Sequence, residues 1–220
     1  MLANYEEKLG EIKSEIITIG EGLLKSNQLI VEGLKNCNEN SFTEAKSYIK
    51  NVSNIVKEID NNIITTLALH SPEAKDLRRM VSYLKITNEL LRAASNTRNF
   101  IKGFSEECKD VDTKIVNDYA IPMQKSTVDA IKYTVDMISI DCVDETQECF
   151  NKVVIAENKT DDLYEMIESE LFKQKPKESD FNKFHKMLVV LRRSEKVADR
   201  AMSIASLLLY ANNGGEIHRV

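Results

Sequence analysis

Two pairs of acidic residues stand out in the second half of the chain: Glu157 with Asp161, and Glu195 with Asp199. Residues four apart lie on the same side of a helix, so each pair presents two carboxylates together. Glu157 and Glu195 also fall in line with the apolar stripes of their helices. Because an unpaired ionised carboxylate is very costly to bury, a metal ion, arginines or water must neutralise these side chains.

The four carboxylates predict a cation site if their two helices pack antiparallel. Mg²⁺, Mn²⁺ and iron take carboxylate oxygens, and helical bundles hold such ions between facing acidic positions. The alternative is ordinary solvated charge, because Glu157, Glu195 and Asp199 each have a basic residue within two positions. Acidic pairs of this spacing are common in charged helices, so spacing alone favours the alternative.

Other catalytic groupings are missing from the sequence. His70, His185 and His218 are scattered, without an HExxH motif, and no GxxxxGK[ST] or GxGxxG loop occurs. We therefore predict that the protein is not an enzyme. The cysteines lack CxxC spacing and are too sparse for a disulfide framework or a zinc site, as is typical of a reducing cytoplasm. They are Cys37, Cys108, Cys142 and Cys149.

The composition predicts an all-α protein. The 220 residues include only 7 glycines and 3 prolines, too few for the turns of a β-sandwich or barrel, and 42% of them are hydrophobic, enough for a core. Acidic residues outnumber basic ones by 35 to 30, which disfavours nucleic-acid binding. No signal-peptide pattern or membrane-length apolar run occurs. We expect a cytoplasmic protein, peripheral to a membrane at most.

Apolar residues recur with helical spacing over six long segments. We expect helices at about residues 2–34, 41–70, 72–104, 111–140, 145–172 and 179–209. Ser41 is the expected N-cap of the second helix, with Glu44 as its capping-box partner. Ser71 is the expected N-cap of the third, with Pro72 at its first position. Pro122 either kinks the fourth helix or marks its start.

An offset of 104 residues aligns the third and sixth segments. It pairs Pro72 with Pro176, each followed four residues later by an aspartate. We interpret the chain as two tandem three-helix units, residues 1–104 and 105–220. The units form either two bundles end to end or one merged layer. A pseudo-twofold contact that buries both apolar faces is the more economical arrangement.

Two segments resemble signatures of PhoU proteins. Residues 72–78 (Pro-Glu-Ala-Lys-Asp-Leu-Arg) are similar to the family's Pro-x-Ala-x-Asp-Leu-Arg motif. Residues 194–201 (Ser-Glu-Lys-Val-Ala-Asp-Arg-Ala) resemble its Leu-Glu-Arg-Ile-Ala-Asp-His-Ala segment, which contains an acidic metal motif. The resemblance covers nearly the whole chain and implies two tandem, pseudo-symmetric three-helix bundles.

The resemblance also implies a function. PhoU proteins are cytoplasmic regulators of phosphate uptake that restrain the phosphate-starvation response. The implied partners are a membrane-bound sensor histidine kinase and the ATPase of the phosphate ABC transporter. Family members form dimers or larger oligomers, so we expect a homodimer.

The metal motif carries over unequally to the two units. The family implies bound iron, zinc, manganese or magnesium, and the second unit matches its acidic positions with Glu157, Asp161, Glu195 and Asp199. The 104-residue offset places no carboxylate at the corresponding positions of the first unit, which are Ser53, Lys57, Leu91 and Ser95. A lysine ammonium repels a metal ion. We therefore expect a metal site in the second unit only.

Two further functions stay open. PhoU-like chains attach to low-affinity phosphate or divalent-cation carriers, so the chain could be an accessory module of such a carrier. A carboxylate metal-binding bundle for storage or catalysis is the other alternative. Such bundles typically carry Glu-x-x-His pairs, and this sequence contains none.

Overall fold

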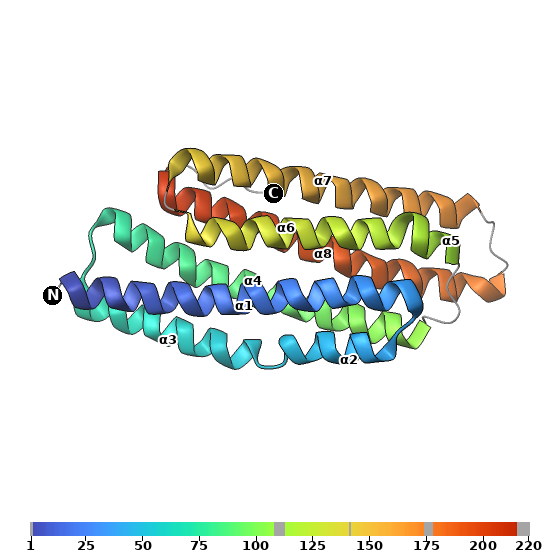
Figure 1. Cartoon of the computed structure of the whole chain (residues 1–220), viewed down its shortest axis with the longest axis horizontal. Coiled ribbons are helices and arrows are strands. Elements are labelled where there is room, and N and C mark those ends of the chain that lie inside the picture. The colour runs from blue at the N-terminus through green and yellow to red at the C-terminus, as the bar shows by residue number, and fades with distance from the viewer. Residues whose placement is uncertain (1, 108–112, 141, 174–177, 215–220) are drawn as a thin grey trace.

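The computed structural model describes residues 2–107, 113–140, 142–173 and 178–214, and all the secondary structure within them is helical. The prediction of an all-α protein is therefore confirmed (Figure 1). In chain order the elements are α1 (Leu2–Asn36), α2 (Glu39–Tyr48), α3 (Val52–His70), α4 (Ala74–Glu107), α5 (Thr113–Ile115), the π-helical η2 (Val116–Ala120), α6 (Ile121–Ser139), α7 (Val143–Lys173) and α8 (Glu178–Asn213).

Four inner helices, α1, α4, α6 and α8, form the centre of an elongated bundle (Figure 1). The main contacts between the two halves of the chain join α1 to α6 and α4 to α8. The α2–α3 segment packs on α1 and α4, and α7 packs on α6 and α8. The buried side chains of both halves belong to one continuous core. The halves are thus merged side by side, while the repeat boundary at residue 104 stays a prediction.

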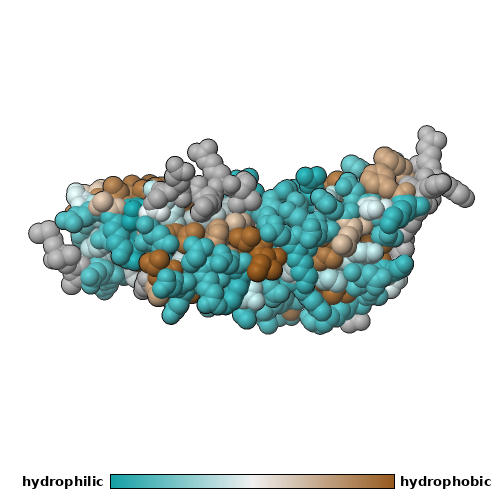
Figure 2. All heavy atoms as spheres, turned by 90° about the horizontal axis from the view of Figure 1, so that it is seen from above, coloured by the Kyte–Doolittle hydropathy of each residue, from teal (hydrophilic) through white to brown (hydrophobic). Residues whose placement is uncertain are grey.

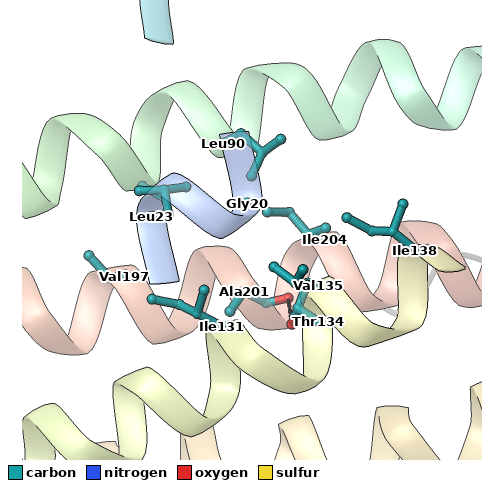
Figure 3. A pocket seen from close by; sticks show the side chains of 11 residues that line it. Gly20, Leu23, Leu90, Ile131, Thr134, Val135, Ile138, Val197, Ala201 and Ile204 are labelled. Carbon is teal, nitrogen blue, oxygen red and sulfur yellow. Dashed lines mark hydrogen bonds between the residues drawn. The ribbon is translucent and has the colours of Figure 1, made fainter. Parts of the chain in front are cut away.

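Glycines permit close approach of the helices at both contacts between the halves. A Cβ atom on Gly20 of α1 would lie 2.7 Å from Val135 Cγ2 of α6, and one on Gly103 of α4 would lie 2.4 Å from Val190 Cγ2 of α8. Such distances are shorter than van der Waals contact. Gly20 also borders an apolar cavity of about 20 Å³ where the four inner helices meet (Figure 3).

A buried chain of hydrogen bonds crosses all four inner helices. Asn27 Nδ2 of α1 donates to Thr97 Oγ1 of α4 (3.3 Å), and Gln124 Nε2 of α6 donates to Asn27 Oδ1 (2.9 Å). Ser194 Oγ of α8 donates to Gln124 Oε1 (2.6 Å) and lies 3.1 Å from Thr127 Oγ1. All five side chains are buried. Because a buried polar group without a partner is costly, this network favours one register between the halves.

The second expected helix is interrupted, so the prediction of one helix over residues 41–70 is wrong. It divides into α2 and α3 around Ile49, whose side chain is fully buried. The Ile49 carbonyl accepts a hydrogen bond from Arg98 Nη2 of α4 (3.1 Å). This contact from a distant residue satisfies a carbonyl group that the break removes from the helical ladder.

Both predicted N-caps are wrong. Asn38 caps α2, since its side chain accepts a hydrogen bond from the second backbone N–H that follows it, and Ser41 lies inside the helix. Ser71 ends α3 in the left-handed conformation, with φ of 42°. Because a left-handed residue terminates a helix, α4 begins only at Ala74, two residues after Pro72. Pro176, the predicted counterpart of Pro72, lies outside the described residues.

Pro122 lies at the start of α6 but inside a longer helical path. The backbone stays helical from Ile115 through η2 to Ile121. The Ile121 N–H bonds to the Val116 carbonyl, five residues back. Proline cannot donate a backbone hydrogen bond, and the π-helical turn just before it widens the ladder at that point. Neither a sharp start nor a simple kink describes the position.

The cysteines only partly match the sequence-based expectation. Cys37, in the turn between α1 and α2, is disulfide-bonded, contrary to the expectation of reduced cysteines. Cys142 and Cys149 are free. Sequence spacing does not report which cysteines meet in space, because disulfide formation depends on the distance between their Cα atoms.

The surface is mainly polar, with apolar side chains interspersed on the face seen in Figure 2. Large exposed apolar residues occur on both halves of the chain and include Leu69, Ile155, Phe172 and Phe181. Among the described helices, none has an apolar stretch long enough to cross a membrane.

Candidate metal centre

Helices α7 and α8 run antiparallel and bring acidic side chains together (Figure 1). Thr160 of α7 and Ala198 of α8 are completely buried, which orients the adjoining acidic positions toward the contact. Ligand oxygens from Glu157, Asp161 and Asp199 all lie within 4.8 Å of one another. The structure therefore places three of the four predicted residues within reach of a single ion.

Glu195, the fourth predicted residue, borders this triad without being part of it. Its carboxylate is buried, with Lys196 Nζ 3.0 Å from Oε1 and Arg192 Nε 3.8 Å from Oε2. Oε2 has no hydrogen-bond partner, and neither has Oδ1 of Asp161. We call Glu157, Asp161, Glu195 and Asp199 the acidic cluster.

Crowding of carboxylates changes their proton affinity. Burial, and then the charges of Asp161, Asp199 and Glu195, raise the pKa of Glu157 to about 7, against an opposing effect of Lys196. The pKa of Asp161 is also raised, by burial first and then by Glu195 and Asp199. The cluster therefore holds more negative charge than its own cations neutralise.

Lys196 is the cation in closest contact with the cluster. Its Nζ donates to Asp199 Oδ2 (2.7 Å) and to Glu195 Oε1 (3.0 Å). Burial opposes the charged form of this lysine, but the hydrogen bonds to Asp199 and Glu195, together with the negative charges of these two residues, outweigh that effect and raise its pKa. The alternative of solvated charge predicted an exposed pair here, whereas Glu195 and Asp199 side chains are only 12% and 14% exposed.

A residue that the sequence reasoning missed connects the cluster to the first half. Arg200 Nη1 donates to Glu89 Oε2 of α4 (2.9 Å), and Arg200 Nη2 lies 3.6 Å from Asp199 Oδ2. Glu89 belongs to no motif and lies far from α8 in sequence. Only a prediction of the register between α4 and α8 could have identified it.

The donor set fits a hard or borderline divalent cation. Three carboxylates converge, and two buried carboxylate oxygens of the cluster have no hydrogen-bond partner. Mg²⁺, Mn²⁺ and iron accept such oxygen ligands, and Zn²⁺ also binds carboxylates. Glu157, Asp161 and Asp199 are the residues that would hold the ion, with Glu195 beside them.

The corresponding positions of the first half form no such group. They are Ser53, Lys57, Leu91 and Ser95. The two serines and the lysine are exposed, and the leucine packs against the core. Within the described parts of the chain, the triad on α7 and α8 is the one set of three or more side chains arranged to hold a metal ion.

Sequence comparisons connect the chain to proteins of phosphate transport. Residues 16–102 match the family model of the PhoU domain. Over 222 residues the chain is 25% identical to a phosphate-specific transport system accessory protein PhoU homolog of Clostridium acetobutylicum, covering 97% of this chain and 96% of that protein. A PhoU homolog 1 of Methanothermobacter thermautotrophicus is 21% identical over 218 residues, covering 94% of this chain and 93% of its own length.

Solved structures share the fold. The crystal structure of PhoU from Pseudomonas aeruginosa superposes with a TM-score of 0.82 at 18% identity, covering 96% of this chain and all of that one (100%). The phosphate transport system regulatory protein PhoU from Streptococcus pneumoniae also gives 0.82, at 15% identity, covering 98% of this chain and 100% of its own. The domain match, the full-length relatives and the common bundle agree, and all of them support the PhoU family for this chain.

Proposed function

We propose that this protein is a regulator of phosphate uptake that restrains phosphate-starvation signalling. In this proposal it binds a sensor histidine kinase and the ATPase of a phosphate ABC transporter in the cytoplasm. A divalent metal ion held by the acidic cluster adjusts that binding. The activity is association with partners, without catalytic turnover.

One observation carries the proposal. The relatives that align over nearly the whole chain are named as accessory proteins of the phosphate-specific transport system. Alignment over the full length, rather than over one helix pair, supports a shared role in phosphate transport.

The surface and the acidic cluster support a binding role. Apolar side chains are exposed on both halves, and such side chains contribute strongly when a partner covers them. A regulator transmits a signal only if it binds two partner states with different affinity. Metal occupancy would supply such a difference by changing the charge and rigidity of the α7–α8 pair.

Gene deletion tests the regulatory role directly. We expect phosphate-scavenging genes to be expressed constitutively in ample phosphate when the protein is absent, and repression to return when it is supplied again. Unchanged expression in the deletion strain would overturn the proposal. A variant with Lys152→Met, which alters only an exposed ion pair with Glu148, is the matched control and should restore repression fully.

A homodimer is the oligomeric state that we propose. Light scattering on the purified protein would then give twice the chain mass of 25.0 kDa. A mass of one chain at all concentrations would exclude it.

Two alternative functions have separate tests. The converging carboxylates favour a metal-binding bundle as the second candidate. Elemental analysis of the purified protein, followed by oxygen-consumption and phosphatase assays, would identify a storage or catalytic role. Capture of membrane partners would reveal an accessory role if it recovered a low-affinity phosphate or cation carrier instead of the kinase and the ATPase.

A further inference from the structure

Lys196 places a positive charge in the acidic cluster itself. Its ammonium lies 2.7 Å from Asp199 Oδ2, and the Asp199 carboxylate also belongs to the triad that could hold a metal ion. The same ammonium lies 3.0 Å from the adjoining Glu195. An ammonium and a divalent cation would therefore draw on the same carboxylate group.

The Lys196 ammonium neither neutralises all the carboxylates of the acidic cluster nor gives each of their oxygens a hydrogen bond. One charge on Lys196 faces four carboxylates, and Asp161 Oδ1 and Glu195 Oε2 stay buried without hydrogen-bond partners. The guanidinium of Arg200 is engaged more closely with Glu89, at 2.9 Å, than with Asp199, at 3.6 Å. Arg192 approaches Glu195 only to 3.8 Å. The cluster thus keeps oxygen atoms for an additional cation.

We propose that Lys196 is an internal counter-ion that must leave the acidic cluster before a divalent metal ion can bind. This inference rests on the metal-binding part of the proposed function. Two positive charges a few ångströms apart repel strongly at the low effective dielectric of a partly buried site. The lysine side chain is 36% exposed, so its flexible stem has a route to solvent.

Two consequences follow from the displacement. Without metal, Lys196 holds Glu195 and Asp199 together and limits the repulsion in the cluster. With metal, the ammonium moves outward and adds a positive charge to the surface of α8. Lys196 therefore weakens metal affinity and sets the metal concentration at which the site fills.

Isothermal titration of chelator-treated protein with Mn²⁺ alone tests this inference. Lys196→Met retains the length of the side chain and removes its charge, so we expect its dissociation constant to be lower than that of the unaltered protein by about tenfold or more. Lys196→Arg keeps the charge and should bind as weakly as the unaltered protein. Lys152→Met, which removes a similar lysine from a 2.7 Å pair with exposed Glu148, should leave the affinity unchanged.

The outcomes separate the inference from the metal proposal. If Lys196→Met binds Mn²⁺ no tighter than the unaltered protein while Glu157→Gln with Asp161→Asn abolishes binding, the site is correct and the role of Lys196 is wrong. If neither the unaltered protein nor Lys196→Met binds Mn²⁺, both the metal site and the role of Lys196 are wrong. The regulatory role is tested separately, by the deletion experiment. Should Lys196→Met not fold without metal, Lys196→Gln replaces it, with the same expected result.

Discussion

The two halves of the molecule pair their outer and inner helices with different chemistry. In the first half, Asp60 of α3 accepts a hydrogen bond from Thr87 Oγ1 of α4 at 2.7 Å, so a neutral hydroxyl satisfies one carboxylate. In the second half, Glu157 and Asp161 of α7 face acidic residues of α8. The second arrangement leaves two buried oxygens of the cluster without hydrogen-bond partners.

This difference bears on the metal site proposed for the second half. Both outer segments pack on two inner helices, so the scaffold itself does not demand the acidic cluster. Buried polar groups without hydrogen-bond partners are a local departure from the rules of stable folding, and such departures concentrate at functional sites. Unsatisfied buried atoms also occur in the first half, among them Glu15 Oε2, but among the described residues three carboxylates converge only on α7 and α8. This convergence supports the metal site proposed for the second half.

Removing two acids from α7 should have the largest effect. With Glu157→Gln and Asp161→Asn, the triad keeps only Asp199, and we expect Mn²⁺ affinity to fall by about 100-fold or more. Titration calorimetry measures the loss. Lys57→Gln, at the position of the first half that corresponds to Asp161, is the control and should not alter the affinity. Equal loss in both variants would contradict the assignment to the second half.

Gln124 should contribute most to joining the halves. Gln124→Leu leaves Asn27 Oδ1 and Ser194 Oγ without their Gln124 partner in a buried site, so we expect a loss of about 2–3 kcal/mol of unfolding free energy. Urea denaturation followed by circular dichroism measures it. Gln147→Leu removes an exposed contact with Asn151 and should cost less than about 0.5 kcal/mol. Similar losses of unfolding free energy for the two variants would show that the hydrogen-bond network does not stabilise the contact between the halves.

The acidic cluster should make stability depend on pH. Because the pKa of Glu157 rises from 4.5 in the unfolded chain to about 7 in the folded protein, the folded state binds more protons between these values. Stability should then decrease as pH rises through this window and level off above it. We expect Tm without metal to fall by about 2–5 °C from pH 5 to pH 8.

Glu157→Gln provides the comparison for this pH effect. Its side chain has no carboxyl proton to lose, so the decrease in Tm should become shallower. Differential scanning calorimetry in chelating buffer measures both profiles. Identical slopes would place the pH dependence outside the cluster.

The ion pair between the halves should have the smallest effect. Arg200→Met removes the 2.9 Å contact with Glu89, but Glu89 keeps Arg92 at 3.3 Å and Asp199 keeps Lys196. We expect a loss of about 1 kcal/mol in unfolding free energy, measured by urea denaturation. A loss above that of Gln124→Leu would mean that charge, rather than the buried network, joins the halves.

Helical content and the composition of the candidate site could be predicted from local information. The scarcity of glycine and proline and the 3.6-residue periodicity are sufficient for long helices. Spacing of four residues places Glu157 with Asp161, and Glu195 with Asp199, on common faces. The absence of carboxylates at Ser53, Lys57, Leu91 and Ser95 is also a property of sequence alone.

The break in the second helix and the pairing of the two halves could not be predicted, because they depend on contacts between residues distant in sequence. Arg98 reaches the Ile49 carbonyl where the second helix breaks, and the packing of α4 on α8 brings Glu89 to Arg200. The sequence by itself determined which side chains share a helix face, because that periodicity is local. Only the tertiary structure decided which faces meet, that Lys196 enters the cluster and that Glu195 borders the triad, because distances between helices follow from the packing of the whole core.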